Sequence, residues 1–438
     1  RGDQAWRREL MKVIKVKNVE TFVAQLNSKK TDIDSSIVSS IIRDVKKNGD
    51  HAVKKYEKKF SKAIITNIKI SQTEINAALK SLSKSQLDSI NESKSRLLKT
   101  ESAIKSILKN KTITNNGVKI SKKFIPLDSV GCYIPGGLAR YPSSVIMSVI
   151  PAKIAGVKRI VVVSPPNSSG KIDPMTIAAA KICGANEIYK TGGVQSIAAL
   201  AYGTKSIPKV DKIVGPGGAF VTEAKFQVSR NVSIDMLAGP TELGIIVDNS
   251  TNPKYAALDL ISQAEHSNDT FCYIITTSEK IAKQINSILD KIISQIDRKD
   301  IVKSSLSKNG FIAICKNNTD LISLANQMAS EHLQIMTRNS EKLASKITSP
   351  GLILTGNDSP SSASDYILGS NHILPTNGFG KVRGSLSVLD FMKLNTQVRT
   401  SKDGLKKISK SMEILTNSEG LSNHFEAVRG RLKWKKTG

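Results

Sequence analysis

From residue 129 onward, short apolar runs, glycine turns and helix-like segments alternate, and this alternation limits the fold more than any other feature. VGCYIP leads through a glycine turn into the helical pattern SVIMSVIPAKIAGV, and RIVVVSPP leads into DPMTIAAAKICGA. EIYKTGG and DKIVGPGG are each followed by a helical pattern in the same way. Strands that alternate with helices form parallel sheets with right-handed crossovers. The sequence therefore predicts an α/β fold.

A second series of the same kind occupies about residues 243–355, from LGIIVD through a long helical pattern over 278–296 to GFIAICK. At 438 residues the chain is also too long for a single hydrophobic core. The two series predict two Rossmann-like parallel-sheet domains, one inserted in the other, with small helical segments at both ends.

The expected domain boundaries follow the changes in pattern. They are an N-terminal helical arm over 11–30, a larger α/β domain made of 31–132 and 243–378, an inserted Rossmann-like domain over 133–242, and a C-terminal helical arm over 379–438. Residues 34–48 and 71–109 have apolar positions at helical spacing, and Ser71 with Glu74 forms a capping-box start. Asn-Gly at the centre of TITNNGVKI (112–120) predicts a hairpin.

The net charge of +28 raises the question of a nucleic-acid partner, but its distribution argues against one. Residues 1–123 hold 28 basic and 12 acidic residues, and the last ten residues add five basic ones. These lysines are spread around helical patterns without interleaved aromatic residues, which is typical of a solvated surface. We therefore expect no nucleic-acid partner.

Other compositional features favour a cytoplasmic protein without a membrane span. No stretch approaches the roughly 20 apolar residues that cross a bilayer. The four cysteines have no CxxC spacing and lie in apolar contexts, which favours buried thiols in a reducing compartment. Residues 1–10 precede the first methionine and lack the apolar core of a signal peptide, so we set them aside as leader sequence.

Three glycine turns lie between an expected strand and an expected helix: YIPGG (133–137), TGGVQ (191–195) and GPGG (215–218). Backbone N–H groups at a helix N-terminus can bind an anion, and glycine lets a pyrophosphate approach closely. None of the turns matches G-x-G-x-x-G with an acidic residue about 20 positions further on. Ordinary tight turns therefore explain these glycines as well as a cofactor site does.

The histidines carry more information than the glycines. Four of the five lie near carboxylates, as the pairs Glu265–His266, Glu331–His332, Asp365–His372 and Glu419–His424, whereas His51 lies in a lysine-rich helical pattern. Gln263 and His266 are three residues apart on an expected helix, so both can point at one ligand. Imidazole, amide and carboxylate donors suit zinc, manganese or cobalt. The remaining histidine and carboxylate groups could instead act as a general base.

With these residues in place, the sequence resembles the histidinol dehydrogenase family, from about residue 41 to residue 429. The resemblance rests on ordered motifs, which are GCYIPGG, YPSSVIMSVIPAKIAGV, GGVQSIAALAYGT, VDKIVGPGG, AGPTE, SQAEH, SEHLQI, SDYILGSNHILPT and EGLSNH. That family oxidises L-histidinol to L-histidine in two NAD-dependent steps, through an aldehyde that stays bound. The resemblance implies a zinc- and NAD-dependent four-electron oxidation, the last step of histidine biosynthesis. It also implies an intertwined homodimer.

The resemblance further assigns roles to individual residues. One zinc ion per subunit would be bound by Gln263, His266, Asp365 and His424, with His424 on the arm that reaches the partner subunit. His332 would take protons during alcohol oxidation, and Glu331 would activate the water that hydrates the aldehyde. The substrate would contact Thr241, Gln263, His266, His332, Asp365, His372, Glu419 and His424. NAD would contact Tyr133, Gln195 and Gly218.

The chain departs from the family pattern at two positions. Gly218 follows GPG where the family usually has asparagine, which removes a side-chain amide and puts one cofactor contact in doubt. Thr241 of AGPTE stands where serine is usual, and its hydroxyl group is kept.

Three alternatives compete with histidinol oxidation. A related NAD-dependent dehydrogenase could oxidise another polyol or a sulfonated alcohol, although the carboxylate of Glu419 suits an ammonium group and repels a sulfonate. Cys132 could accept an aldehyde as a nucleophile, but no neighbouring histidine or lysine lowers its pKa. A basic nucleic-acid-binding protein that has lost catalysis would not be expected to keep the metal and base motifs intact.

Overall fold

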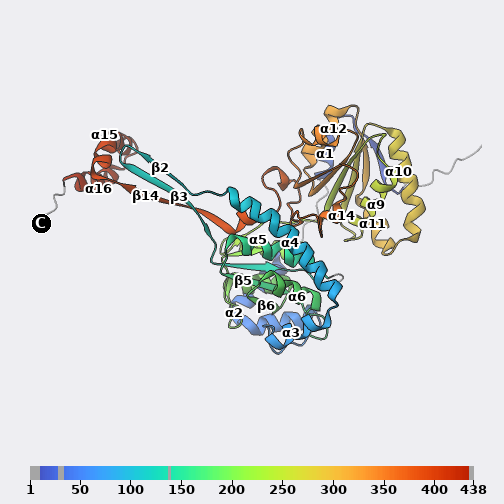
Figure 1. Cartoon of the computed structure of the whole chain (residues 1–438), viewed down its shortest axis with the longest axis horizontal. Coiled ribbons are helices and arrows are strands. Elements are labelled where there is room, and N and C mark those ends of the chain that lie inside the picture. The colour runs from blue at the N-terminus through green and yellow to red at the C-terminus, as the bar shows by residue number, and fades with distance from the viewer. Residues whose placement is uncertain (1–9, 28–33, 137–139, 434–438) are drawn as a thin grey trace, which may run out of the picture.

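Two parallel β-sheets and one antiparallel sheet organise the chain, which a computed structural model describes over residues 10–27, 34–136 and 140–433. Each parallel sheet forms the centre of a lobe, and the antiparallel sheet extends away from both lobes as an arm (Figure 1). The prediction of an α/β fold with two parallel-sheet units is confirmed.

The first lobe is built on a six-stranded sheet in which neighbouring strands are all parallel. Its strands, in spatial order, are β1 (Lys12–Lys15), β11 (Phe311–Ile314), β10 (Phe271–Thr276), β9 (Glu242–Val247), β12 (His332–Met336) and β13 (Leu352–Thr355). The central strands are buried on both faces, which explains their continuous apolar runs. One face packs against α9 (Pro253–Ala264), α10 (Glu279–Ile292) and α11 (Lys299–Asn309), and the other against α1 (Val19–Asn27) and α12 (Asn318–Met328).

The second lobe is built on a five-stranded parallel sheet. Its strands, in spatial order, are β6 (Glu187–Lys190), β5 (Arg159–Ser164), β4 (Ser129–Tyr133), β7 (Lys212–Val214) and β8 (Ser233–Ile234). Its crossover helices are α5 (Pro142–Ala155), α6 (Pro174–Cys183), α7 (Gly193–Tyr202) and α8 (Ala219–Val228). The helices α5 and α6 contribute to the core on one face, and α7 and α8 to the core on the other.

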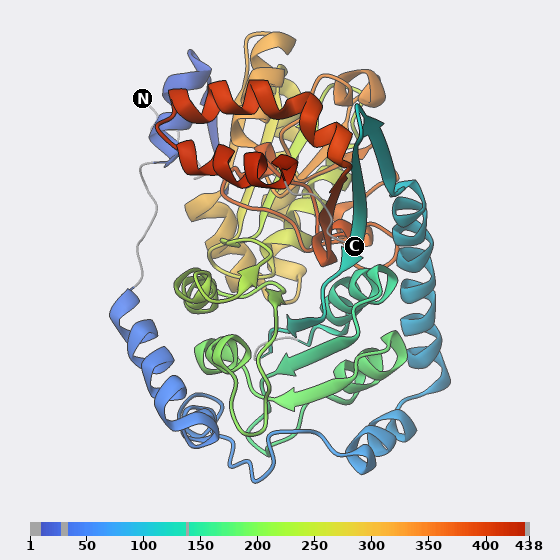
Figure 2. The ribbon, with the colours of Figure 1, turned by 90° about the vertical axis from the view of Figure 1, so that its left-hand side faces the viewer.

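Three helices from the early part of the chain also belong to this second lobe: α2 (Ser35–Phe60), α3 (Gln72–Ser81) and α4 (Lys84–Ile107). They pack against α7, α6 and α5 respectively, and Figure 2 shows them around the lower lobe. This packing differs from the predicted grouping of 31–132 with 243–378. The apolar stripe of a helix shows which of its faces is buried but does not show which sheet covers that face.

The N-terminal segment also differs from the helical arm that was predicted for 11–30. Residues Lys12–Lys15 form the edge strand β1, which pairs in parallel with β11, and α1 follows directly. A four-residue strand is too short for its sequence pattern to reveal it. The remainder of that predicted arm, residues 28–30, lies outside the described residues.

The arm combines two segments that are far apart in the sequence. Its sheet contains β2 (Lys111–Asn115), β3 (Val118–Pro126) and β14 (Met392–Thr400), with β3 in the centre, and its tip carries α15 (Lys402–Ser418) and α16 (Ser422–Lys433). The predicted hairpin is confirmed, with positive φ at both Asn116 and Gly117 of the turn. The C-terminal segment was predicted to be helical, but it also contains the strand β14. The sequence pattern does not reveal this strand, because its pairing partner β3 lies more than 260 residues earlier.

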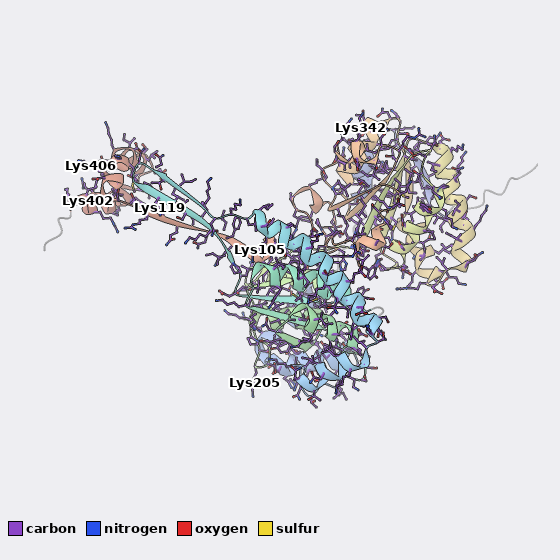
Figure 3. The ribbon with its side chains drawn as sticks, viewed as in Figure 1. Lys105, Lys119, Lys205, Lys342, Lys402 and Lys406 are labelled. Carbon is purple, nitrogen blue, oxygen red and sulfur yellow. The ribbon has the colours of Figure 1, made fainter. Side chains whose placement is uncertain are left out.

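Lysines occur on all parts of the molecule. Those marked in Figure 3 lie on α4, on the arm and on both lobes: Lys105, Lys119, Lys205, Lys342, Lys402 and Lys406. Among the described helices none is both long enough and apolar enough to cross a membrane. The absence of a nucleic-acid partner stays a prediction.

Candidate active site

Five of the predicted site residues come together where the first lobe meets the second, at the amino ends of the strands of the six-stranded sheet, and these are His266, Glu331, His332, Asp365 and His372. Glu331 directly precedes β12, and His332 is its first residue. Gln263 and His266 lie at the end of α9, while Asp365 follows the short helix α14 (Ser361–Ser364), which packs against α9. Open α/β sheets usually bind ligands at the carboxyl ends of their strands, and this cluster lies at the opposite edge.

A chain of hydrogen bonds runs through the cluster and joins the two lobes. His332 Nε2 lies 3.2 Å from Asp365 Oδ1, and His372 Nδ1 lies 2.6 Å from the carbonyl oxygen of Asp365. Both oxygens accept, so both ring nitrogens donate. His372 Nε2 is 3.1 Å from the hydroxyl of Ser144 on α5, in the other lobe. Burial lowers the pKa of His372, so its neutral ring accepts from that hydroxyl.

Asp365 and His332 affect each other's protonation. Burial alone would lower the pKa of His332, but the hydrogen bond to Asp365 and the charges of Glu331 and Asp365 outweigh it and raise the pKa to about 9. Burial would raise the pKa of Asp365, but the bond from His332 lowers it overall. The contact fixes one proton on Nε2, whereas Nδ1 is buried 3.8 Å from Glu331 Oε2 and has no hydrogen-bond partner among the described residues. The proton that titrates is therefore the one on Nδ1, and with a pKa of about 9 this atom accepts a proton only in the deprotonated fraction of His332.

Glu331 and Glu242 are joined by two reciprocal hydrogen bonds, each from the backbone of one residue to the side chain of the other. The backbone N–H of Glu242 donates to Glu331 Oε2 at 3.0 Å, and the backbone N–H of Glu331 donates to Glu242 Oε2 at 3.2 Å. Glu242 Oε1 also accepts from the backbone N–H of Asn377. Burial raises the pKa of Glu331 to about 8, although the charge of His332 acts in the opposite direction. A carboxyl group that titrates near working pH suits general acid and base chemistry.

Gln263 lies in the last turn of α9, and His266 directly follows the C-cap residue Glu265. That the two side chains point at one ligand stays a prediction. Gln263 is buried, His266 is half-buried, and burial lowers the pKa of His266. One turn earlier, Asp259 accepts a hydrogen bond of 2.8 Å from Gln334 of β12, which fixes α9 against the strand that carries His332. Burial raises the pKa of Asp259 to about 6.

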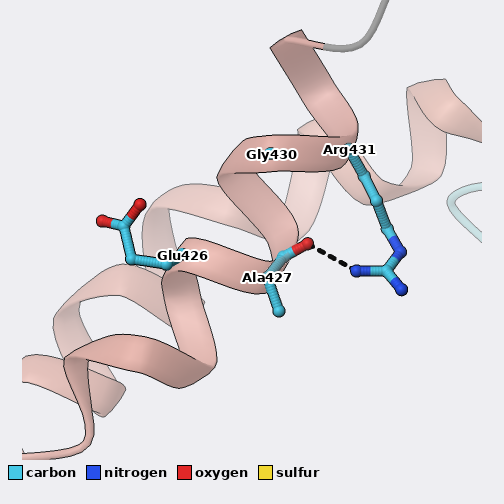
Figure 4. A pocket seen from close by; sticks show the side chains of 4 residues that line it. All are labelled: Glu426, Ala427, Gly430 and Arg431. Atoms are coloured by element: carbon cyan, nitrogen blue, oxygen red, sulfur yellow. Dashed lines mark hydrogen bonds between the residues drawn. The ribbon is translucent and has the colours of Figure 1, made fainter.

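Glu419 and His424 are not near this cluster within one chain. Both are exposed residues at the tip of the arm, where α15 ends and α16 begins, whereas α9 and α14 lie at the opposite end of the molecule (Figure 1). In the described part of the chain, no three His, Cys, Asp or Glu side chains are arranged to hold a metal ion. The pocket in Figure 4, lined by Glu426, Ala427, Gly430 and Arg431 of α16, contains none of the predicted site residues.

The three residues predicted to contact NAD lie at the carboxyl edge of the five-stranded sheet. Tyr133 ends β4, and its hydroxyl accepts from the backbone N–H of Gly193 at 3.4 Å. Gln195 is buried in the first turn of α7. Gly218 is the N-cap residue of α8, with a φ of −66°, and a Cβ there would meet no atom of the described residues within 4 Å. Gly137 of the YIPGG turn lies outside the described residues.

The structure also places Thr241, a predicted substrate contact, and Cys132, the alternative nucleophile. Thr241 is half-buried directly before β9, and its carbonyl oxygen accepts from Phe271 of the neighbouring strand. Cys132 is fully buried in β4, and burial raises the pKa of its thiol. A buried thiol that resists ionisation cannot act as the aldehyde-accepting nucleophile, which removes that alternative.

Sequence reasoning missed three residues around the cluster: Ser144, Asp259 and Glu242. Glu242 could have been noticed, because it belongs to the AGPTE motif. Its contact with Glu331 could not be predicted, because the two residues are 89 positions apart in the chain. Ser144 and Asp259 lie in apolar helical patterns, where a single polar residue gives no signal about its partner. Only the fold brings these pairs into contact.

Two parallel-sheet lobes, one with glycine turns between strands and helices and the other with a buried histidine–carboxylate cluster, define a two-lobed α/β enzyme. The family model for histidinol dehydrogenase matches residues 24–432. The chain belongs to the histidinol dehydrogenase family.

Individual relatives agree over nearly the whole length. A histidinol dehydrogenase of Oceanobacillus iheyensis is 42% identical over 413 residues, which cover 94% of this chain and 96% of that protein. One from Methanocaldococcus jannaschii is 40% identical, over 97% of this chain and 99% of that protein. The crystal structure of histidinol dehydrogenase from Elizabethkingia anophelis superposes with a TM-score of 0.91 at 35% identity, covering 97% of this chain and 99% of that chain.

Proposed function

We propose that this chain oxidises L-histidinol to L-histidine through bound L-histidinaldehyde, the last step of histidine biosynthesis, and reduces two NAD per substrate. The observation that carries the proposal is the group formed by buried Glu331 and His332 with half-buried Asp365, in a chain matched by the family model over residues 24–432. One base for the alcohol step and one for the hydration step are the groups that this reaction needs.

Within this proposal, His332 is the base of the alcohol step. Asp365 holds one proton on Nε2, so Nδ1 is the atom that would take the hydroxyl proton, in the fraction of His332 that is neutral. Glu331 is the base that takes a proton from water when the aldehyde is hydrated. The reciprocal backbone contacts with Glu242 fix the position of its carboxylate. Thr241 and His372 contact the substrate at the edge of the cluster.

The donor set fits a zinc ion in its chemistry. Gln263, His266 and Asp365 offer an amide oxygen, an imidazole and a carboxylate, and these are hard and borderline donors of the kind that zinc accepts. Two of these three, His266 and Asp365, influence each other's pKa through their charges, so they lie within electrostatic range. When bound, one zinc ion per subunit would orient the amine and imidazole of the substrate.

The set lacks its fourth member within one chain, because His424 lies on the arm. We therefore propose a homodimer in which the arm of each subunit brings His424 and Glu419 to the cluster of the other. The arm carries apolar side chains that are about half exposed or more, which are Ile113, Leu394, Val398, Ile414, Leu415 and Leu421. Such a surface is typical of a region that a second subunit covers.

The remaining alternative is an NAD-dependent dehydrogenase for another polyol or a sulfonated alcohol. Glu419 decides between the two readings, because its carboxylate attracts the ammonium group of histidinol and repels a sulfonate. We place the reaction in the cytoplasm, since all four cysteines are buried free thiols in the structure.

The stoichiometry of NAD reduction tests the proposal. Limiting L-histidinol with excess NAD should yield two NADH per substrate, and a chelator should abolish turnover until zinc is restored. NADH absorbance and chromatographic detection of L-histidine give the result. One NADH per substrate, or full turnover of a sulfonated alcohol instead, would overturn the proposed substrate.

Glu331 should give the aldehyde step its dependence on pH. A base works when deprotonated, so the rate of L-histidinaldehyde oxidation should rise as pH increases through about 8. Glu331→Gln should lower this rate by roughly 100-fold or more and remove the part of the rise centred near pH 8. Initial rates of NADH formation between pH 6 and pH 10 measure both effects.

Glu265→Gln is the matched control, because Glu265 also precedes a histidine and is half-buried, yet has no proposed role in proton transfer. It should keep the wild-type pH profile. An unchanged profile in Glu331→Gln as well would contradict the water-activating role.

Gly218→Asn should improve NAD binding. The backbone at Gly218 already has a φ that asparagine adopts, and no described residue lies within 4 Å of an added Cβ. Asparagine is also a favourable N-cap for α8. We expect the KM for NAD to fall about threefold to tenfold, the range of one net hydrogen bond, with an unchanged kcat and no loss of thermal stability. Gly218→Ala, which adds no amide, is the control, and equal KM values for the two variants would disprove an amide contact.

A further inference from the structure

The turn that precedes α7 is capped by a side chain from a distant helix. Gly192, the N-cap residue of α7, has no side chain with which to satisfy the free N–H groups of the first helical turn. Glu57 of α2 fills this position and is fully buried. Its Oε1 accepts from Gly192 N at 2.9 Å, Thr191 Oγ1 at 2.9 Å and Gln195 Nε2 at 2.7 Å.

The other oxygen of this carboxyl group is also engaged, because Glu57 Oε2 accepts from the hydroxyl of Ser61 at 2.7 Å. Both oxygens of Glu57 therefore have donors, and a carboxylate occupies the position where a helix N-terminus could bind a phosphate. A second anion at the same place would be repelled by Glu57 and would find fewer free donors.

The glycine at 192 has a packing explanation that needs no ligand. A Cβ there would lie 2.5 Å from Cβ of Pro165, so no larger residue fits between this turn and the end of β5. The TGGVQ turn is closed on this side by protein atoms. The sequence alone had left a pyrophosphate site open as one explanation of these glycines.

Gln195 is oriented by the same contact. A carboxylate can only accept, so the amide nitrogen of Gln195 must face Glu57 and the amide oxygen must face away from it. Among the described residues that oxygen has no hydrogen-bond partner, and its side chain is only 2% exposed. A Cβ at Gly193 would lie 3.1 Å from it, so a larger residue there would crowd the oxygen.

The free atom of this turn is thus an acceptor, which requires a donor on the ligand. A ribose hydroxyl or an amide NH₂ group can donate, whereas a phosphodiester has no hydrogen to donate. Tyr133 approaches the same turn, since its hydroxyl accepts from the backbone N–H of Gly193. Two of the proposed NAD contacts therefore meet beside Glu57.

We infer that Glu57 is a positioning residue for the cofactor: it holds Gln195 with its amide oxygen outward, so that the α7 turn binds a hydrogen-bond donor of NAD and leaves the diphosphate outside it. This inference rests on the proposed NAD-dependent function. It assigns the turn to a hydroxyl or amide group of the cofactor, and it makes the contact depend on a residue 138 positions away in the chain.

Glu57→Met tests the inference, because the variant keeps the length of the side chain but removes the oxygen that accepts from Gln195 Nε2. The dissociation constant of NAD should increase about fivefold to twentyfold, while kcat at saturating NAD and the KM for L-histidinol stay near wild type. Isothermal titration with NAD and steady-state kinetics measure these quantities. Glu57→Gln can keep an accepting oxygen toward Gly192 N and Gln195 Nε2, so it should retain NAD affinity.

The control is Glu101→Gln. Glu101 of α4 is another buried carboxyl group in the same lobe, and it accepts a backbone hydrogen bond of 2.7 Å from Val388 far from the turn. Its variant should bind NAD like wild type, which separates an effect on the turn from a general loss of packing. The melting temperatures of all variants show that they are folded.

A second cofactor identifies the donor. In 3-acetylpyridine adenine dinucleotide a methyl group replaces the amide NH₂ of the nicotinamide. If Glu57→Met weakens the binding of NAD but not of this analogue, the carboxamide is the donor, and equal weakening of both assigns a donor elsewhere on the cofactor, such as a ribose hydroxyl. Unchanged affinity for both in a folded, active Glu57→Met variant overturns the inference. If instead the wild-type enzyme reduces no NAD with L-histidinol, the proposed function fails.

Discussion

The hydrogen bond between His332 and Asp365 is the contact on which the rest of the site depends. A buried carboxylate must be surrounded by donors, because an unpaired charge in the interior is costly. Asp365 receives one donor at its side chain from β12 and another at its carbonyl oxygen from His372. His372 is in turn fixed by Ser144 of the second lobe. The same few atoms therefore set the tautomer of the proposed base and connect the catalytic cluster to the lobe with the glycine turns.

Both lobes contain a buried carboxyl group whose hydrogen-bond donors include residues distant in the sequence. In the first lobe, Glu331 and Glu242 exchange backbone-to-side-chain hydrogen bonds. In the second lobe, Glu57 accepts from three donors of the α7 turn and from Ser61 at the end of α2. In each case the carboxylate accepts from one backbone N–H group, and Glu57 also accepts from three side-chain donors, so each carboxylate has a fixed geometry. The proposed chemistry uses one of these groups directly and relies on the other to orient a cofactor contact.

The sequence predicts the regular parts of this fold and the identity of its reactive groups. Alternating strands and helices give the two parallel sheets, and Asn-Gly gives the hairpin of the arm. Periodicity could not assign α2–α4 to a sheet or reveal β14, because both depend on partners far along the chain. Histidine–carboxylate pairs marked the cluster, but Glu242, Ser144 and Glu57 act through contacts that only the fold creates. The position of His424 on a separate arm could be expected from the family resemblance alone.

Completion of the site by a second subunit is the central claim, and mixing two inactive variants tests it most directly. His332→Asn lacks the base, and His424→Asn lacks the residue that the arm would supply. After subunit exchange, half of the dimers are hybrids, and each hybrid contains one site with both histidines intact, so about one quarter of wild-type activity should return. If no activity returns although subunit exchange is demonstrated, the site is built within one chain and this account is wrong.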